Sequence, residues 1–190
     1  MKKYGIFIGR FQPFHKGHQA MIDTIISDGL TPLIIVGSVN STDKIRNPYP
    51  FEDVSHMIQL VYPEIKCLPL PDYHDDEKWS AHLIQIIPSA SIIYYCRKEE
   101  DLHDAKHYLD FIEEKGISLK AIYPNEISIP VRASLIRENI ELYKDYLDNS
   151  VYAFIKNNRS CDLTPTFFNT TLPIDQTSNQ SNIYSAQPGI

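Results

Sequence analysis

The stretch that decides the fold is GRFQPFHKGH, residues 9–18. It follows an apolar run that begins at Tyr4 and ends at Gly9, a pattern typical of a strand buried on both faces of a sheet. Residues 16–27 then carry apolar side chains at the spacing of a helix. The quoted stretch is therefore predicted to be the turn that joins a first strand to a first helix.

The same alternation continues along the chain. We expect further strands at 33–36, 66–70, 91–96 and 119–123, and further helices at 51–62, 77–87, 99–115, 134–146 and 150–157. Strands that alternate with helices predict an α/β fold, a Rossmann-like parallel sheet with helices on both faces. Ligands of such sheets bind beyond the carboxyl ends of the strands, where the unusual residues of this chain fall.

The last part of the chain has a different composition. Residues 1–158 are predicted to form a single domain, since 190 residues fit one domain with a core of its own. Residues 159–190 form a polar tail, with one charged residue, Asp175, after position 163. Such a tail is either disordered or an extended arm on another subunit, so a homo-oligomer stays open.

Composition and charge argue against several classes of protein. Hydrophobic residues make up 43% and charged residues 22% of the chain, as in a soluble globular protein. The net charge of -6 argues against a nucleic acid partner. The three cysteines lack C-x-x-C spacing, which argues against a zinc site and favours a reducing compartment. Because no apolar run approaches the length of a signal-peptide core or a membrane span, we expect a cytoplasmic protein with no membrane association.

Two histidines stand at the predicted start of the first helix. Gly9 lets the backbone pass close to a ligand, and the N–H groups of a helix start favour phosphate. His15 and His18 are three residues apart, so both imidazoles can face one side and donate hydrogen bonds to phosphate oxygens. The alternatives are packing or surface histidines, and a metal pair, for which no third ligand stands at a recognisable spacing.

This stretch resembles the H-x-G-H signature of the nucleotidyltransferase superfamily. In its longer form, G-R-F-Q-P-F-H-x-G-H, it resembles the archaeal-type nicotinamide-nucleotide (NMN) adenylyltransferases. H-x-G-H alone is shared with pantetheine-phosphate adenylyltransferases and cytidylyltransferases, so the ten-residue form carries the assignment. The resemblance implies that ATP is bound by Gly9, Arg10, Phe11, Gln12, His15 and His18.

A second segment follows the next predicted strand. Gly37 and Ser38, and then KIRNPY at residues 44–49, are similar to the family's G-S and R-[ND]-P-F elements. Arg46 carries a planar, permanently charged guanidinium that can pair with a triphosphate, and a solvated loop arginine is the alternative. The resemblance implies that Arg46 binds ATP. It places Gly37, Ser38 and Asn47 on the NMN side.

A third segment selects the acceptor. Residues 69–72 read PLPD, and together with Trp79 they resemble the family's P-V-x-D segment and downstream tryptophan. The resemblance implies that Asp72 and Trp79 bind NMN. An indole face can stack on the cationic pyridinium ring, and a core tryptophan is the alternative.

A fourth segment, VRASLIR at residues 131–137, aligns with the family's I-S-x-T-x-x-R motif. The resemblance implies that Val131, Ser134 and Arg137 bind ATP. Ser134 is predicted to be a helix N-cap, and Arg137 to hold the triphosphate from the side opposite the histidines. The alternative for Arg137 is an exposed helix arginine paired with a neighbouring glutamate.

The chain also departs from the family pattern. Arg132 replaces the first serine of the fourth motif, with no role that the sequence assigns. Val54 follows Asp53 where relatives often carry an arginine, and Arg97 and Lys98 stand where relatives often carry a glycine. These departures leave the residues that contact the adenine ring unassigned.

The sequence therefore predicts an NMN adenylyltransferase. The 5′-phosphate of NMN attacks the α-phosphorus of ATP directly, pyrophosphate leaves, and Mg²⁺ enters with ATP while no protein residue is assigned as its ligand. His15, His18, Arg46 and Arg137 are the predicted catalytic residues, and Lys16 is a weaker candidate. Two alternatives stay open: an adenylyltransferase of the same fold that takes nicotinic acid mononucleotide or phosphopantetheine, and a non-catalytic nucleotide-binding regulatory module.

Overall fold

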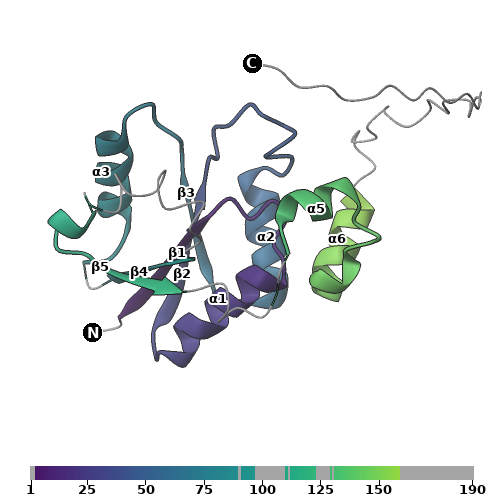
Figure 1. The fold of residues 1–190 in the computed structure, drawn as a ribbon, viewed down its shortest axis with the longest axis horizontal. Coiled ribbons are helices and arrows are strands. Elements are labelled where there is room, and N and C mark those ends of the chain that lie inside the picture. The colour runs from purple at the N-terminus through teal and green to yellow at the C-terminus, as the bar shows by residue number, and fades with distance from the viewer. Residues whose placement is uncertain are drawn as a thin grey trace, which may run out of the picture.

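The fold is built on one parallel sheet (Figure 1). The structure is a computed structural model that describes residues 3–89, 91–96, 110, 112–122, 129 and 131–158. The strands are β1 (Tyr4–Gly9), β2 (Thr31–Gly37), β3 (Lys66–Leu70), β4 (Ser91–Cys96) and β5 (Ser118–Ile122). Every neighbouring pair is parallel, in the order β3-β2-β1-β4-β5. The strand order therefore reverses at β1, and a crevice for ligands is expected beyond the carboxyl ends of β1 and β4.

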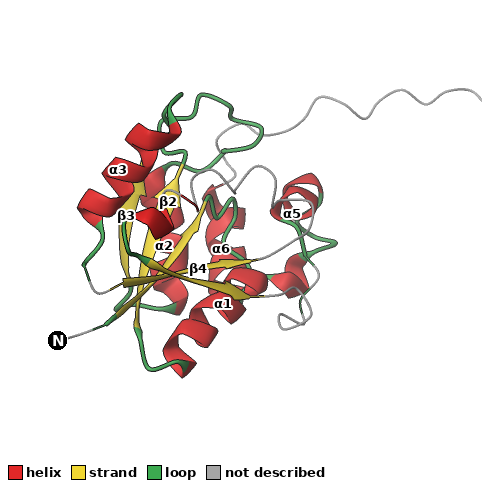
Figure 2. Cartoon of the chain, turned by 60° about the vertical axis from the view of Figure 1, so that its left-hand side comes forward, coloured by secondary structure: helices red, strands yellow, loops and turns green. Residues whose placement is uncertain are grey.

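Helices cover both faces of this sheet. They are α1 (Lys16–Ser27), α2 (Phe51–Val61), α3 (Asp76–Ile86), α5 (Ala133–Glu138), the 3-10 turn η1 (Lys144–Tyr146) and α6 (Asn149–Asn158). In Figures 1 and 2, α3 lies on one face, while α1, α2 and α6 lie on the other. The predicted α/β fold with helices on both faces is confirmed.

The predicted helix over 134–146 is wrong in its second half. Helix α5 ends at Glu138, because Asn139 leaves the helical region with φ −149° and ψ 90°. The side-chain Oδ1 of Asn139 then accepts a hydrogen bond of 3.0 Å from the N–H of Leu142. An asparagine that binds nearby backbone in this way competes with helix continuation. The chain turns here and reaches α6 through η1.

Several expectations fall outside the described residues. They concern most of the helix expected at 99–115, the pair Arg97 and Lys98, the strand end at Tyr123, and the tail 159–190.

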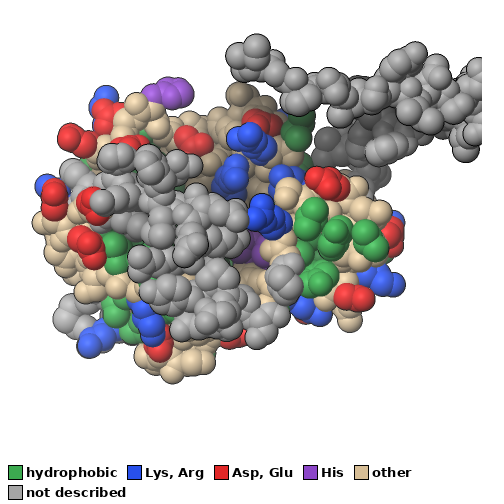
Figure 3. Space-filling view, in the orientation of Figure 1, with side chains coloured by type: hydrophobic (Ala, Val, Ile, Leu, Met, Phe, Trp, Pro, Cys, Tyr) green, Lys and Arg blue, Asp and Glu red, His purple; other side chains and the backbone are tan. Residues whose placement is uncertain are grey.

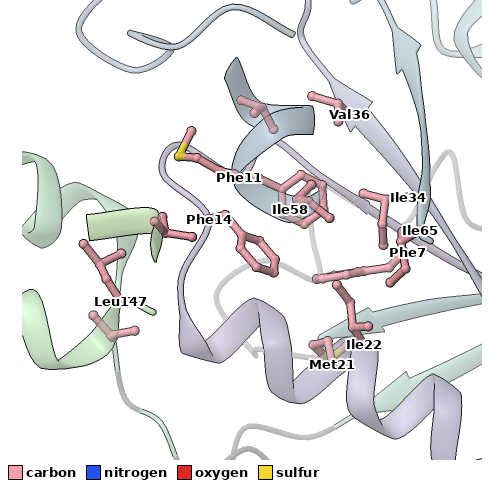
Figure 4. Packing of buried hydrophobic residues seen from close by; sticks show 14 of the residues in the cluster. Phe7, Phe11, Phe14, Met21, Ile22, Ile34, Val36, Ile58, Ile65 and Leu147 are labelled. Atoms are coloured by element: carbon pink, nitrogen blue, oxygen red, sulfur yellow. The ribbon is translucent and has the colours of Figure 1, made fainter. Parts of the chain in front are cut away.

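The turn between β1 and α1 is anchored in the larger of the two apolar cores that the described residues form. This core fills the space between the sheet and α1, α2 and α6. Phe11 and Phe14 are 1% and 0% exposed, and Figure 4 shows both rings among the core side chains near α1. Full burial of such a side chain is worth about 1.5–3 kcal/mol. Two aromatic anchors therefore fix a turn that would otherwise be a free surface loop.

Helix α1 lies close against β1 because of a glycine in that strand. A Cβ built at Gly5 would stand 2.3 Å from Cγ2 of Ile25, so no larger residue fits without moving the helix. This contact holds the last turn of α1 against the beginning of β1.

Candidate active site

The two histidines form the start of α1. His15 is the N-cap residue, and its Nδ1 accepts a hydrogen bond of 3.1 Å from the N–H of Gly17. In return, Nδ1 of His18 accepts a hydrogen bond of 3.2 Å from the N–H of His15. Because both Nδ1 atoms act as acceptors, the neutral rings carry their protons on Nε2. Each imidazole is thereby set to donate from Nε2, as phosphate binding requires.

Ring contacts fix the orientation of this pair. The His15 and His18 rings stack with their centroids 3.6 Å apart and their planes 22° from parallel. Phe14 stacks on His18 at 5.8 Å, and the edge of Phe11 meets it at 4.9 Å. The predicted same-side placement of the two histidines is confirmed.

Steric contact explains why glycine occupies position 17 of the H-x-G-H motif. A Cβ at Gly17 would stand 3.0 Å from Cε1 and 3.1 Å from Nδ1 of His15, closer than ordinary van der Waals contact. Glycine at this position therefore lets the His15 ring lie over the helix start.

Arg137 reaches the histidine turn from the far end of the sequence. Its Nη1 donates a hydrogen bond of 2.6 Å to the carbonyl oxygen of Gln12. Burial lowers the pKa of this guanidinium, and the nearby charge of Arg10 lowers it further. This bond and the partial burial of Arg137 argue against the alternative of an exposed helix arginine paired with Glu138 or Glu141, although the charge of Glu138 still acts on the guanidinium. Arg10 adds a second positive charge near Arg137, and the carboxylates of Glu138 and Asp43 partly offset it. Positive charge gathered at this point suits an anionic ligand such as phosphate.

Arg46 forms an ion pair with Asp43, a carboxylate that also interacts with the charge of Arg10. The Arg46 Nε lies 3.6 Å from Asp43 Oδ2, and the Arg46 side chain is 72% exposed. The backbone N–H of Arg46 holds the pKa of Asp43 below its usual range, and the charges of Arg46 and Arg10 lower it further. Figure 3 shows Lys and Arg side chains gathered beside a histidine in the centre of one face. Arg10, Arg46 and Arg137 therefore share one electrostatic environment.

Four predicted ATP-binding residues have other principal contacts. The Gln12 amide donates to the carbonyl oxygen of Tyr49 at 2.8 Å and accepts from its N–H at 2.9 Å. The side chains of Phe11 and Val131 are buried in the core. Ser134 is not the N-cap of α5, since Arg132 holds that position without a side-chain cap. Any contact of Phe11 or Val131 with a nucleotide would therefore involve the backbone.

Lys16 also has a structural contact. Its Nζ donates a hydrogen bond of 2.8 Å to the carbonyl oxygen of Asp145 in η1. This bond ties the start of α1 to the C-terminal segment that carries Arg137.

A separate pocket of about 320 Å³ opens on the α3 side of the sheet. Ile8, Ile93 and Tyr95 contribute to it from β1 and β4, and Asp72, Asp76 and Trp79 from α3 and the loop before it. Among the described residues that line the pocket, two are carboxylates and none is Lys or Arg. Aromatic faces beside carboxylates suit a flat, cationic ring.

Gly37, Ser38 and Asn47, the remaining residues of the predicted NMN side, do not line this pocket. Ser38 Oγ donates a hydrogen bond of 3.0 Å to Asp72 Oδ1. Gly37 ends β2, where a Cβ would meet only the Gly9 carbonyl oxygen at 3.9 Å. Asn47 is 8% exposed and donates through Nδ2 to Ser41 Oγ at 3.0 Å. These three residues shape the loop between β2 and α2.

Sequence reasoning missed Asp43, Asp76 and Asn40. Asp43 accepts hydrogen bonds of 3.0 Å from the N–H groups of Ile45 and Arg46, a local turn that the order Asp-x-x-Arg could have indicated. Asp76 stands three residues before Trp79 on α3, a spacing that puts both on one helix face. Asn40 has no such local signal, because its partner Asp72 is 32 positions away.

Two general features of the described residues bear on the site. None of the described helices has the length and apolarity that crossing a membrane requires. Three or more His, Cys, Asp or Glu side chains nowhere gather into a metal-binding group within the described ranges.

Fold and site together first define a class: a Rossmann-like nucleotidyltransferase fold with arginines and histidines gathered beyond the central strand. Residues 6–139 match the family model described as cytidylyltransferase-like, and the chain belongs to that family.

The chain is also similar to individual relatives. It is 26% identical over 101 residues to the nicotinamide-nucleotide adenylyltransferase of Thermococcus kodakarensis, covering 50% of this chain and 54% of the relative. With that of Methanocorpusculum labreanum it shares 32% identity over 94 residues, or 47% of this chain and 56% of the relative. The chain thus spans about half the length of these curated relatives.

A solved structure shares the fold. It is the bifunctional NMN adenylyltransferase/ADP ribose pyrophosphatase of Francisella tularensis, complexed with AMP and a manganese ion. The TM-score is 0.61 at 22% identity, over 82% of this chain and 50% of that one.

Proposed function

We propose that this protein is a nicotinamide-nucleotide adenylyltransferase that joins ATP and NMN to give NAD and pyrophosphate. One observation carries the proposal: the 2.6 Å hydrogen bond from Arg137 to the Gln12 carbonyl oxygen. It brings the late arginine to the histidine turn, so that both sides of a single bound triphosphate can be contacted. The names of the similar archaeal proteins support the same reaction.

The reaction needs positioning more than acid–base chemistry. A 5′-phosphate oxygen of NMN attacks the α-phosphorus of ATP. The bond between the α-phosphorus and the oxygen that bridges it to the β-phosphorus breaks, and pyrophosphate leaves. The attacking phosphate is ionised near neutral pH, so no general base is required. Catalysis then consists of alignment and of neutralising charge on the phosphate oxygens.

The donors for that charge come from the described site. His15 and His18 would donate from Nε2 to the α- and β-phosphates, since their Nδ1 atoms accept backbone N–H groups. Arg10, Arg46 and Arg137 would hold the rest of the triphosphate. Mg²⁺ would arrive on ATP and be held mainly by phosphate oxygens, and the AMP-bound relative with a manganese ion supports a divalent metal in this chemistry.

The acceptor pocket favours the amide over the acid. The pyridinium ring of NMN would stack on Trp79, with its carboxamide near Asp72 or Asp76. A carboxamide N–H can donate to a carboxylate, whereas the carboxylate of nicotinic acid mononucleotide would face like charge.

The test is pyrophosphate release by the full chain with ATP and each candidate acceptor in turn. We expect release with NMN and much less with nicotinic acid mononucleotide or phosphopantetheine. Release with phosphopantetheine alone would overturn the assignment in favour of another transferase of this fold. Tight ATP binding without pyrophosphate release from any acceptor would instead support a regulatory module.

A further inference from the structure

The loop that joins β2 to α2, residues 38–50, is held at both ends by side-chain amides. At its start, Asn40 pairs with the backbone of Asp72. At its end, the backbone of Tyr49 pairs with the side chain of Gln12. In each case one amide both donates to and accepts from the backbone of a single distant residue. Arg46 lies between the two attachments, so this loop connects the pocket to the phosphate side.

The Asn40 attachment is specific in its geometry. Asn40 Nδ2 donates to the Asp72 carbonyl oxygen at 3.0 Å, and its Oδ1 accepts from the Asp72 N–H at 2.7 Å. Ser38 adds a third bond, from its Oγ to Asp72 Oδ1. Ser38 also has a left-handed backbone, with φ +58°. A residue other than glycine in this region is strained and persists only where surrounding contacts hold it.

We propose that Asn40 is a positioning residue for the acceptor mononucleotide, an inference that rests on the proposed function. Asp72 lies beyond the end of β3 and lines the pocket together with Asp76 and Trp79. One hydrogen bond donated by Asn40 and one that it accepts fix the Asp72 backbone in the free protein. Without them, this wall of the pocket must be ordered at the moment of binding, and that ordering weakens affinity.

Gln12 provides an internal comparison with the same chemistry on the opposite side. Its bonds to Tyr49 hold the loop against the histidine turn, and its carbonyl oxygen accepts from Arg137. Gln12 is therefore expected to influence ATP, whereas Asn40 influences the acceptor. If either amide had a purely structural role, its loss would affect the binding of ATP and of the acceptor alike.

The experiment uses the single tryptophan of the chain, Trp79, as a reporter. NMN is titrated while indole fluorescence is followed, and KM values for NMN and ATP are measured by pyrophosphate release. Asn40→Ala is expected to weaken NMN binding and raise its KM about tenfold, as the net loss of two hydrogen bonds implies. The KM of this variant for ATP should stay within about twofold of the wild-type value. A twofold change corresponds to a smaller free energy than the loss of one hydrogen bond.

Two further variants complete the comparison. Gln12→Ala is expected to raise mainly the KM for ATP. Gln85→Ala removes an amide from the exposed side of α3, and it should change neither constant. Thermal unfolding of each variant sets an assay temperature at which all are folded.

Each outcome decides the inference. NMN binding by Asn40→Ala at wild-type affinity overturns it, and so does an equal rise in both KM values. If NMN quenches the indole fluorescence of the wild-type protein but no pyrophosphate is released, the proposed reaction is refuted, while the binding titration still tests Asn40. Wild type that binds no NMN refutes both.

Discussion

Replacing His18 by asparagine separates the two nitrogens of this imidazole. The amide oxygen of asparagine can take the place of Nδ1 and keep accepting from the His15 N–H, which lies 3.2 Å from that atom. Nothing in asparagine reaches the position of Nε2. The variant therefore keeps the helix start and removes the proposed phosphate donor. His18→Ala removes both.

The magnitudes follow from these contacts. Loss of a preorganised donor to a developing charge costs about 2.7–4 kcal/mol, or roughly 10²–10³ in kcat. Both variants should lose turnover to this extent. The capping interaction that only alanine removes is worth about 1 kcal/mol of helix stability. His18→Ala should therefore have the lower free energy of unfolding of the two.

The assay is pyrophosphate release at saturating ATP and NMN, together with urea unfolding of wild type and both variants. If the contribution of His18 were the cap alone, asparagine would preserve turnover and only alanine would lose it. Near wild-type kcat in His18→Asn would thus refute the role of Nε2, whatever the unfolding data show.

Three other predictions concern separate parts of the molecule. Trp79→Ala should raise the KM for NMN about tenfold or more through lost stacking, and leave the KM for ATP nearly unchanged; a parallel rise in both would contradict the pocket assignment. Gly17→Ala should displace the His15 ring, which the new Cβ would meet at 3.0 Å. We expect kcat to fall about tenfold or more. Helix stability should change by less than about 1 kcal/mol, because the gain of alanine over glycine offsets the loss of the His15 cap; unchanged kcat would show that the ring need not move. Asp28 accepts hydrogen bonds from Lys120 and from Tyr94, and the Lys120 bond is the main cause of its lowered pKa. A carboxylate whose pKa is lowered in the folded state stabilises the fold at pH values above its ordinary pKa of about 4. This contribution is lost as the pH falls through the folded-state pKa. Urea unfolding from pH 7 down to pH 2 should therefore show Asp28→Asn less stable than wild type near neutrality and equal to it at the acid end, and a constant difference would exclude this cause.

Local patterns predicted the elements on which the site is built. The apolar run 4–9 and the helical spacing of 16–27 gave the bounds that β1 and α1 have. These features were legible because strand and helix periodicities depend on neighbours within a few positions. That His15 and His18 face the same side follows from their spacing in the same way.

Prediction failed where a polar side chain took another position or partner than its residue type suggested. The helix expected over 134–146 stops at Glu138, because the Asn139 side chain binds the N–H of Leu142. Ser134 was assigned as N-cap from its residue type, but α5 begins one position before it. The pairing of the Gln12 amide with the Tyr49 backbone, 37 positions away, had no local signal, and a contact of Gln12 with ATP stays a prediction. Residue type alone does not specify which of several possible partners a polar side chain takes.

The sequence by itself determined the strand–turn–helix unit, the placement of its two histidines on one side and the parallel α/β class, since each depends on short-range periodicity and sterics. Only the tertiary structure decided which distant groups meet there. Arg137 reaches a carbonyl oxygen 125 positions earlier, and Asn40 holds a residue 32 positions later. Such pairs form because packing of the sheet and its helices brings their backbones together, and no local pattern encodes that proximity.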